Sequence, residues 1–133
     1  MFETKTNIKL HDTDAAGVVF FVNYFRIAHT AYEAFLKSIG CGLDYVIRHS
    51  DYLILIAHAE ADYERAFQLG DVITIGLKAT KIGQSSFEIT SEIRDTAGNV
   101  GATVRTVHVA VSKKTAEKMA LPDKIRTGLE SIS

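Results

Sequence analysis

The spacing of apolar and polar residues changes along the chain, and the change separates expected strands from an expected helix. Residues 4–10 alternate strictly, which predicts a first strand that ends at the acidic segment Asp12-Thr13-Asp14. Residues 71–82 and 87–94 also alternate, and Gly83-Gln84 predicts the turn that joins them. Residues 97–99 predict a further turn into a strand over residues 100–111. The last three segments therefore predict consecutive antiparallel strands.

A helical period over Asn23 to Ile39 predicts one long helix. Asn23 is a suitable N-cap residue, and Gly40 is a suitable stop. The polar side chains of this segment gather within about 100° of the helical wheel, and the remaining circumference is apolar. These polar residues are Arg26, His29, Thr30, Glu33 and Lys37. The helix is therefore expected to be mostly buried, and in so short a chain only a curved sheet can wrap it.

Two further segments complete the expected fold. Residues 52–67 have a helix-like Ala and Glu content, but their apolar and polar positions alternate, so we interpret them as a strand. Pro122 begins a short closing helix that reaches about Ile132 and buries Ile125 and Leu129. The pattern predicts an α+β fold in which five antiparallel strands pack against one long helix.

Composition narrows the class of protein. The chain has 133 residues, 47% of them hydrophobic, and we expect one domain over residues 1–133. A single cysteine, Cys41, excludes an internal disulfide framework, and no cluster has zinc-finger spacing. The net charge is -1 without a long basic block, so no nucleic-acid partner is expected. No apolar run approaches a membrane span, and the first residues do not resemble a signal peptide, so we expect a cytoplasmic protein without membrane contact.

The segment before the long helix is the strongest candidate for chemistry. Nucleophile-elbow, phosphate-loop and zinc-protease motifs are absent, and the segment from Asp12 lacks the ligands of a calcium loop. Asp12 and Asp14 can simply form side-chain turns beside the positive end of a helix. Alternatively, free N–H groups at the helix start can polarise a carbonyl while a nearby aspartate attacks it. The residue types alone leave both interpretations open.

The run from Asp12 to Tyr24 resembles the signature of hot-dog-fold acyl-CoA thioesterases of the 4-hydroxybenzoyl-CoA type. The resemblance extends over nearly the whole chain, through residues 29–36, His58 and Tyr63, Gly70-Asp71, and Leu121-Pro122. Within the family, the chain is most similar to the 1,4-dihydroxy-2-naphthoyl-CoA hydrolases of quinone biosynthesis. Phe21 stands where the branch linked to the Tol-Pal system commonly has His, and His29 replaces the Asp of some 4-hydroxybenzoyl-CoA enzymes.

The resemblance implies a sheet wrapped around the long helix, assembly into a homodimer or homotetramer, and active sites at subunit interfaces. Asp14 matches the catalytic carboxylate, which acts as a nucleophile or as a base for water. The backbone N–H of Phe21 matches the oxyanion donor. The expected substrate-binding residues are His29 for a ring hydroxyl and, for other parts of the acyl-CoA, His58, Lys81, Ser85 and Ser86. Neither a metal nor a cofactor is expected, because coenzyme A is part of the substrate.

The expected function is therefore hydrolysis of an aromatic acyl-CoA thioester, with 1,4-dihydroxy-2-naphthoyl-CoA as the first candidate. The same chemistry on 4-hydroxybenzoyl-CoA, or on short or medium aliphatic acyl-CoAs, is the nearest alternative. Two alternatives from other classes remain. The chain can be a non-catalytic acyl-CoA binding module, or a metal-dependent hydrolase that uses Asp12 and Asp14.

Overall fold

One antiparallel sheet provides the frame of the molecule. The computed structural model describes residues 1–133, and its five strands lie in the order β1-β3-β4-β5-β2. The strands are β1 (Phe2–Asn7), β2 (Tyr52–Tyr63), β3 (Val72–Ile82), β4 (Ser86–Arg94) and β5 (Val100–Ser112). The two hairpins expected from the alternating segments, β3–β4 and β4–β5, are confirmed. The segment with mixed helix and strand signals is also a strand, but it ends at Tyr63 rather than Phe67.

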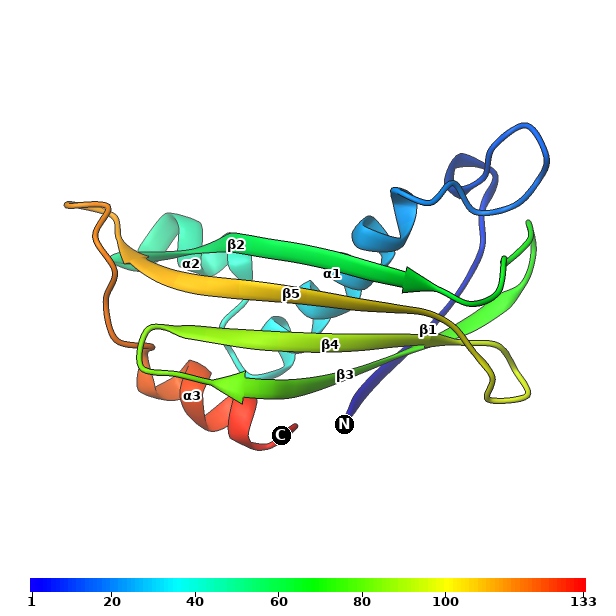
Figure 1. Cartoon of the computed structure of the whole chain (residues 1–133). Helices are drawn as coiled ribbons and strands as arrows, with labels where there is room; N and C mark the ends of the chain where they lie inside the picture. The colour runs from blue at the N-terminus through cyan, green and yellow to red at the C-terminus, as the bar shows by residue number, and fades with distance from the viewer.

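The long helix α1 (Asn23–Ser38) packs along one face of this sheet (Figure 1). Its buried side chains interleave with inward-facing residues of β3, β4 and β5, and together they form a single core cluster. The polar stripe expected on the wheel is present, because Arg26, Thr30, Glu33 and Lys37 are exposed and His29 is half-buried. The expected arrangement of a curved sheet around one helix is confirmed, and none of the helices is long and apolar enough to cross a bilayer.

Two shorter helices complete the fold. The closing helix α3 (Asp123–Glu130) follows Pro122, and Ile125, Leu129 and Ile132 are buried as expected. A helix that the sequence pattern did not predict, α2 (Leu43–His49), follows the turn after α1. Gly40 ends α1 with a φ of 77°, a conformation that favours glycine. The expected stop of the long helix is therefore confirmed.

The chain between β1 and α1 differs from expectation in two respects. The first strand ends at Asn7, and residues 10–12 form a 3-10 helix, η1 (Leu10–Asp12), in which the Leu10 side chain is 74% exposed. Ile8 lies in the connection that follows β1, and its side chain packs into the core. The alternating pattern therefore extends past the end of the strand. The N-cap of α1 is Val22, whereas the Asn23 side chain donates to the Asp12 carbonyl at 2.9 Å. Asn23 therefore ties the preceding loop to the helix instead of capping it.

Candidate active site

Asp14 lies on an exposed turn between η1 and α1. Its Oδ1 accepts a 2.8 Å hydrogen bond from the Ala16 N–H, and its carbonyl accepts one from the Gly17 N–H at 3.0 Å. Gly17 has a φ of 79°, so this tight turn requires a residue without a Cβ atom. The second carboxylate oxygen, Oδ2, makes no hydrogen bond within the chain. One oxygen thus fixes the side chain, and the other is free to act on a ligand.

Main-chain hydrogen bonds fix the position of this turn. The Asp14 N–H donates to the Val18 carbonyl at 2.9 Å, and the Val19 N–H donates to the Phe67 carbonyl at 2.9 Å. Val18 also forms a bridge with Gln68. These hydrogen bonds hold the turn against the connection between β2 and β3. Asp14 therefore projects from a segment whose backbone position is fixed.

Asp12 has a different environment and a different role. It is 4% exposed, accepts the Lys9 N–H at 2.8 Å and forms an ion pair with Arg26 of α1. Burial by itself raises the pKa of Asp12, but the Lys9 hydrogen bond and the Arg26 guanidinium outweigh it and hold the pKa below its ordinary value. Asp12 therefore fastens the loop to α1. Because its carboxylate is engaged by Arg26, it is not available to share a metal ion with Asp14.

The backbone at Phe21 offers an unpaired donor at the start of α1. The Phe21 N–H donates to no acceptor in the chain, while its carbonyl accepts a 3.2 Å hydrogen bond from the Tyr63 hydroxyl of β2. The Phe21 and Tyr63 rings also meet edge to face, with centroids 6.4 Å apart. A free N–H beside the positive end of a helix can stabilise an oxyanion. The role expected for Phe21 is compatible with this geometry and stays a prediction.

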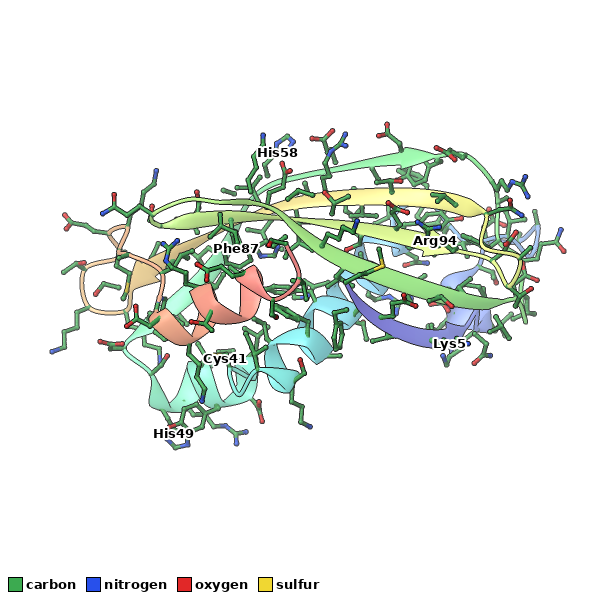
Figure 2. The ribbon with its side chains drawn as sticks, turned by 90° about the horizontal axis from the view of Figure 1, so that it is seen from below. Lys5, Cys41, His49, His58, Phe87 and Arg94 are labelled. Atoms are coloured by element: carbon green, nitrogen blue, oxygen red, sulfur yellow. The ribbon has the colours of Figure 1, made fainter.

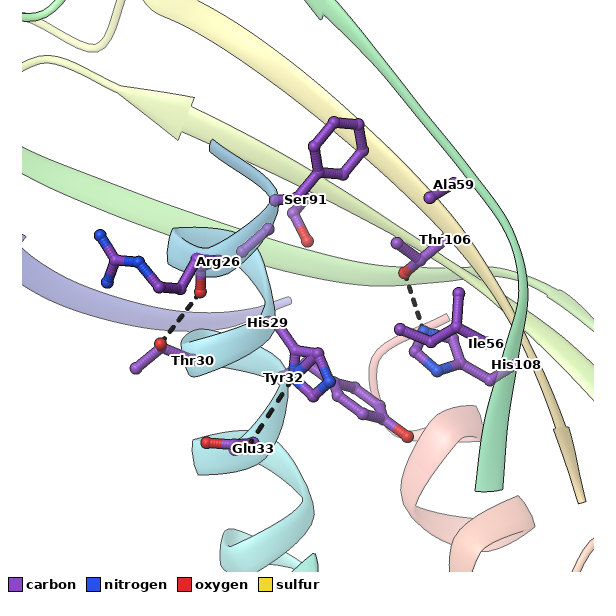
Figure 3. Close-up of a pocket in the computed structure, with 12 residues that line it drawn as sticks. Arg26, His29, Thr30, Tyr32, Glu33, Ile56, Ala59, Ser91, Thr106 and His108 are labelled. Carbon is purple, nitrogen blue, oxygen red and sulfur yellow. Dashed lines mark hydrogen bonds and ion pairs between the residues drawn. The ribbon is translucent and has the colours of Figure 1, made fainter. Parts of the chain in front are cut away.

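A cavity of about 490 Å³ lies between α1 and the sheet (Figure 3). It begins at Phe25 and Arg26, one helical turn after Phe21, and continues along α1 to Glu33. The opposite wall comes from β2, β4 and β5. The residues that line it are Phe25, Arg26, Ala28, His29, Thr30, Tyr32, Glu33, Ile56, Ala59, Ser91, Thr106 and His108. A volume of this size is typical of pockets that bind small organic molecules.

His29 is the one expected substrate-binding residue that lines this cavity. Its side chain is 38% exposed, its Nδ1 lies 3.9 Å from Glu33 Oε1, and its ring meets the edge of Tyr32 at a centroid distance of 5.4 Å. The aromatic contact holds the imidazole at the cavity wall. His29 therefore lies at the wall of this cavity, and its expected contact with an acyl group stays a prediction.

The cavity also contains two buried polar residues that the sequence analysis did not assign, Ser91 of β4 and His108 of β5. The His108 ring packs against both Tyr32 and Phe87, at centroid distances of 4.3 and 4.9 Å, and its Nε2 lies 2.8 Å from Thr106 Oγ1. Burial, with a smaller contribution from His29, lowers the pKa of His108 to about 4. The available sequence signal was a polar residue at an inward-facing strand position, where apolar residues are usual.

The lowered pKa of His108 predicts that stability depends on pH. The unfolded state binds a proton near the ordinary pKa of 6.5, whereas the folded state binds it only near pH 4, so the free energy of unfolding falls as the pH drops between these values. The expected loss from this group is on the order of 3 kcal/mol. Urea unfolding at several pH values, for the wild type and His108→Phe, measures it. A slope in His108→Phe equal to that of the wild type would contradict the prediction.

His58 lies apart from the cavity. It is exposed, its Nε2 is 3.3 Å from Glu60 Oε1, and Glu60 in turn accepts from Arg105. Figure 2 shows His58 on the side of the sheet away from α1. The structure of one chain brings His58 together with neither Asp14 nor His29, and Asp14 itself does not line the cavity that contains His29. A contact between His58 and substrate stays a prediction.

The residues expected at the coenzyme A moiety lie around the β3–β4 hairpin. Lys81 and Ser86 line a shallow hollow of about 310 Å³, while Ser85 uses its carbonyl to accept the Ala110 N–H at 2.9 Å. This hairpin and the loop that carries Asp14 lie at opposite ends of the sheet (Figure 1). The structure of one chain therefore does not bring these residues together with Asp14 (Figure 1).

Comparison with known proteins finds similarity over nearly the whole chain. Residues 8–129 match the family described as Thioesterase-like superfamily. The 1,4-dihydroxy-2-naphthoyl-CoA hydrolase of Rippkaea orientalis is 38% identical over 126 residues, which cover 93% of this chain and 91% of that protein. The corresponding hydrolase of Nostoc punctiforme is 37% identical over 130 residues, covering 98% of this chain and 87% of that protein.

A solved structure supports the same assignment. Slr0204, a 1,4-dihydroxy-2-naphthoyl-CoA thioesterase from Synechocystis, superposes with a TM-score of 0.92 at 28% identity, covering 98% of this chain and 96% of that one. The likeness thus covers nearly the whole fold. Since the family match and the relatives each span nearly all of its length, the chain belongs to the Thioesterase-like superfamily and has its hot-dog fold.

Proposed function

We propose that this chain is an acyl-CoA thioesterase that hydrolyses 1,4-dihydroxy-2-naphthoyl-CoA to 1,4-dihydroxy-2-naphthoate and coenzyme A. The observation that carries the proposal is a free carboxylate oxygen on Asp14 in the turn that leads to the unpaired N–H of Phe21 and the start of α1. The substrate is inferred from the relatives named above, which are hydrolases of this thioester. The cavity beside α1 supplies room for a bicyclic aromatic group.

The proposed chemistry uses groups of the protein and water. Asp14 either attacks the thioester carbonyl carbon or removes a proton from the water that attacks it. Negative charge develops on the carbonyl oxygen, and the Phe21 N–H stabilises that charge. The carbon–sulfur bond then breaks, and the coenzyme A thiolate takes up a proton. In the nucleophilic route, water hydrolyses the Asp14 anhydride and restores the carboxylate.

We further propose that the complete site forms between two copies of the chain. The strand β2 is twelve residues long, pairs only with β5, and exposes Leu55 and Ile56 at the edge of the sheet. Such an edge favours pairing with another chain. A two-fold axis at the β2 edge would make the two copies of β2 antiparallel, so that the two sheets run in opposite directions. The partner's β3–β4 hairpin would then lie toward the end of the first sheet that carries Asp14.

The dimer is tested by sedimentation of the wild type and Leu55→Glu. We expect a dimer or tetramer for the wild type and a shift toward monomer for Leu55→Glu, because the charge would have to be buried at the β2 edge. Val72→Glu is the matched control, since Val72 is equally exposed but lies near β1, at the other side of the sheet. A monomeric wild type that retains full activity would contradict the shared site.

The function is tested by release of free thiol from a panel of coenzyme A esters. The panel contains 1,4-dihydroxy-2-naphthoyl-CoA, 4-hydroxybenzoyl-CoA and short and medium aliphatic acyl-CoAs, with and without a chelator. We expect the highest kcat/KM for the naphthoyl ester and no effect of the chelator. A preference for another ester would assign a different thioesterase substrate, and tight binding without thiol release would indicate a binding module. A cytoplasmic location and the lack of a cofactor stay predictions.

A further inference from the structure

The sheet side of the large cavity carries hydrogen-bonding groups that the protein leaves unused. Ser91 and His108 are 3% and 2% exposed, and both occupy inward-facing strand positions among apolar neighbours. The Ser91 hydroxyl and the His108 Nδ1 have no hydrogen-bond partner in the chain. The one fully enclosed side-chain atom without a partner is Tyr32 Oη, so the Ser91 and His108 atoms remain open to the cavity. Because these two atoms are open to the cavity, a polar group of a bound ligand can form hydrogen bonds with them.

The surroundings of His108 fix what its free nitrogen can do. The ring packs against Tyr32 and Phe87. Thr106 Oγ1 lies 2.8 Å from Nε2 (Figure 3). If the Thr106 hydroxyl donates to Nε2, then Nδ1 carries the proton and donates to the ligand. If Nε2 donates to Thr106, then Nδ1 accepts instead. A ligand hydroxyl suits both cases, because a hydroxyl is both a donor and an acceptor.

The sheet side of the cavity, where Ser91 and His108 lie, favours an uncharged group on the ligand. Because burial keeps the pKa of His108 near 4, its imidazole is neutral at pH 7. Ser91 is also neutral, and the charged residues at the cavity, Arg26 and Glu33, are exposed on α1 rather than on the sheet. An acyl group with a carboxylate or phosphate substituent would lose hydration here without gaining an opposite charge. A phenolic hydroxyl avoids that cost.

We propose that His108 and Ser91 are specificity-determining residues that bind a hydroxyl group on the aromatic acyl moiety. The inference rests on the proposed thioesterase function. It adds the substituent of the acyl group that the sheet side of the cavity recognises, which is a hydroxyl. The protein then discriminates against an unsubstituted ring, because such a ring buries both polar groups without partners. Thr106 acts through His108 as a positioning residue, since it engages the other ring nitrogen, Nε2.

The test compares two coenzyme A esters that differ only in their hydroxyl groups, 1,4-dihydroxy-2-naphthoyl-CoA and 2-naphthoyl-CoA. The measured quantity is the ratio of their kcat/KM values. His108→Phe keeps a flat ring against Tyr32 and Phe87 but removes both nitrogens, and Ser91→Ala removes only the hydroxyl. We expect each variant to lower the ratio about tenfold. A ratio equal to that of the wild type in both variants would overturn the proposal.

A matched control separates the cavity from the rest of β4. Thr90→Val removes a hydroxyl from the neighbouring position, where Thr90 Oγ1 contacts Thr80 Oγ1 at 3.0 Å on the opposite face of the strand. This variant should keep the wild-type ratio. Circular dichroism and Tm identify variants that do not fold. Thr106→Val should lower the ratio less than His108→Phe, because it frees the imidazole to reorient without removing it.

A measurement on the wild type keeps the inference testable if the variants do not fold. With ¹⁵N-labelled histidine, free 1,4-dihydroxy-2-naphthoate should shift the Nδ1 resonance of His108, whereas 2-naphthoate should not. Equal shifts from both acids, or no shift with either at saturating concentration, would overturn the inference. The two proposals fail in different ways: absence of thiol release from every ester refutes the thioesterase, whereas thiol release without selectivity for hydroxyl groups refutes only the role of His108 and Ser91.

Discussion

Asp14→Asn is expected to lower kcat for thioester hydrolysis by about 10²–10⁴-fold while the protein remains folded. An amide is a poor nucleophile and a poor base, so the substitution removes the chemistry in either route. It retains the oxygen that accepts the Ala16 N–H, so the turn around Gly17 should keep its shape. The measurement is thiol release at saturating substrate, together with thermal unfolding. A variant with near-normal turnover would contradict the assignment of Asp14.

Asp12→Asn is the matched control for this result. Asp12 is buried and paired with Arg26, so its loss should act mainly on stability, by about 1–3 kcal/mol. Its turnover should fall far less than that of Asp14→Asn, since Asp12 positions the loop and does not reach a ligand. The reverse order of effects would show that the two aspartates had been assigned to the wrong roles.

Phe35→Ala is expected to lower the free energy of unfolding by about 3–5 kcal/mol. Phe35 is 1% exposed on the buried face of α1, and its ring meets Phe2 of β1 edge to face at a centroid distance of 5.6 Å. Truncation leaves a cavity between α1 and the sheet and removes this aromatic contact. Since small domains have only about 5–15 kcal/mol of stability, a large share would be lost. Urea unfolding monitored by circular dichroism gives the value.

Phe35→Leu fills most of the same space and should cost clearly less than Phe35→Ala. Phe35 lies far along α1 from Asp14, so turnover per folded molecule should stay close to the wild type in both variants at low temperature. A Phe35→Ala protein as stable as Phe35→Leu would show that the core at this position relaxes around the missing ring.

The sequence alone determined the elements whose signals are local. Strict alternation over residues 71–82 and 87–94 placed the strands of the hairpin, and the apolar wheel after Asn23 placed the buried helix. These predictions were confirmed because neighbouring residues carry the pattern that burial imposes. The run from Asp12 to Tyr24 also drew attention to Asp14 and Phe21, because it is contiguous and resembles a family signature.

Tertiary structure decided which residues share a site. Asp12 and Asp14 are two positions apart, yet one is buried against Arg26 and the other is exposed on a turn. Leu10 continued an alternating pattern but lies outside the strand. Ser91 and His108 occupy strand positions that face the core, and only the packing of α1 against the sheet shows that these positions border a cavity. A local pattern gives the direction of a side chain, whereas the space in front of it depends on residues distant in the sequence.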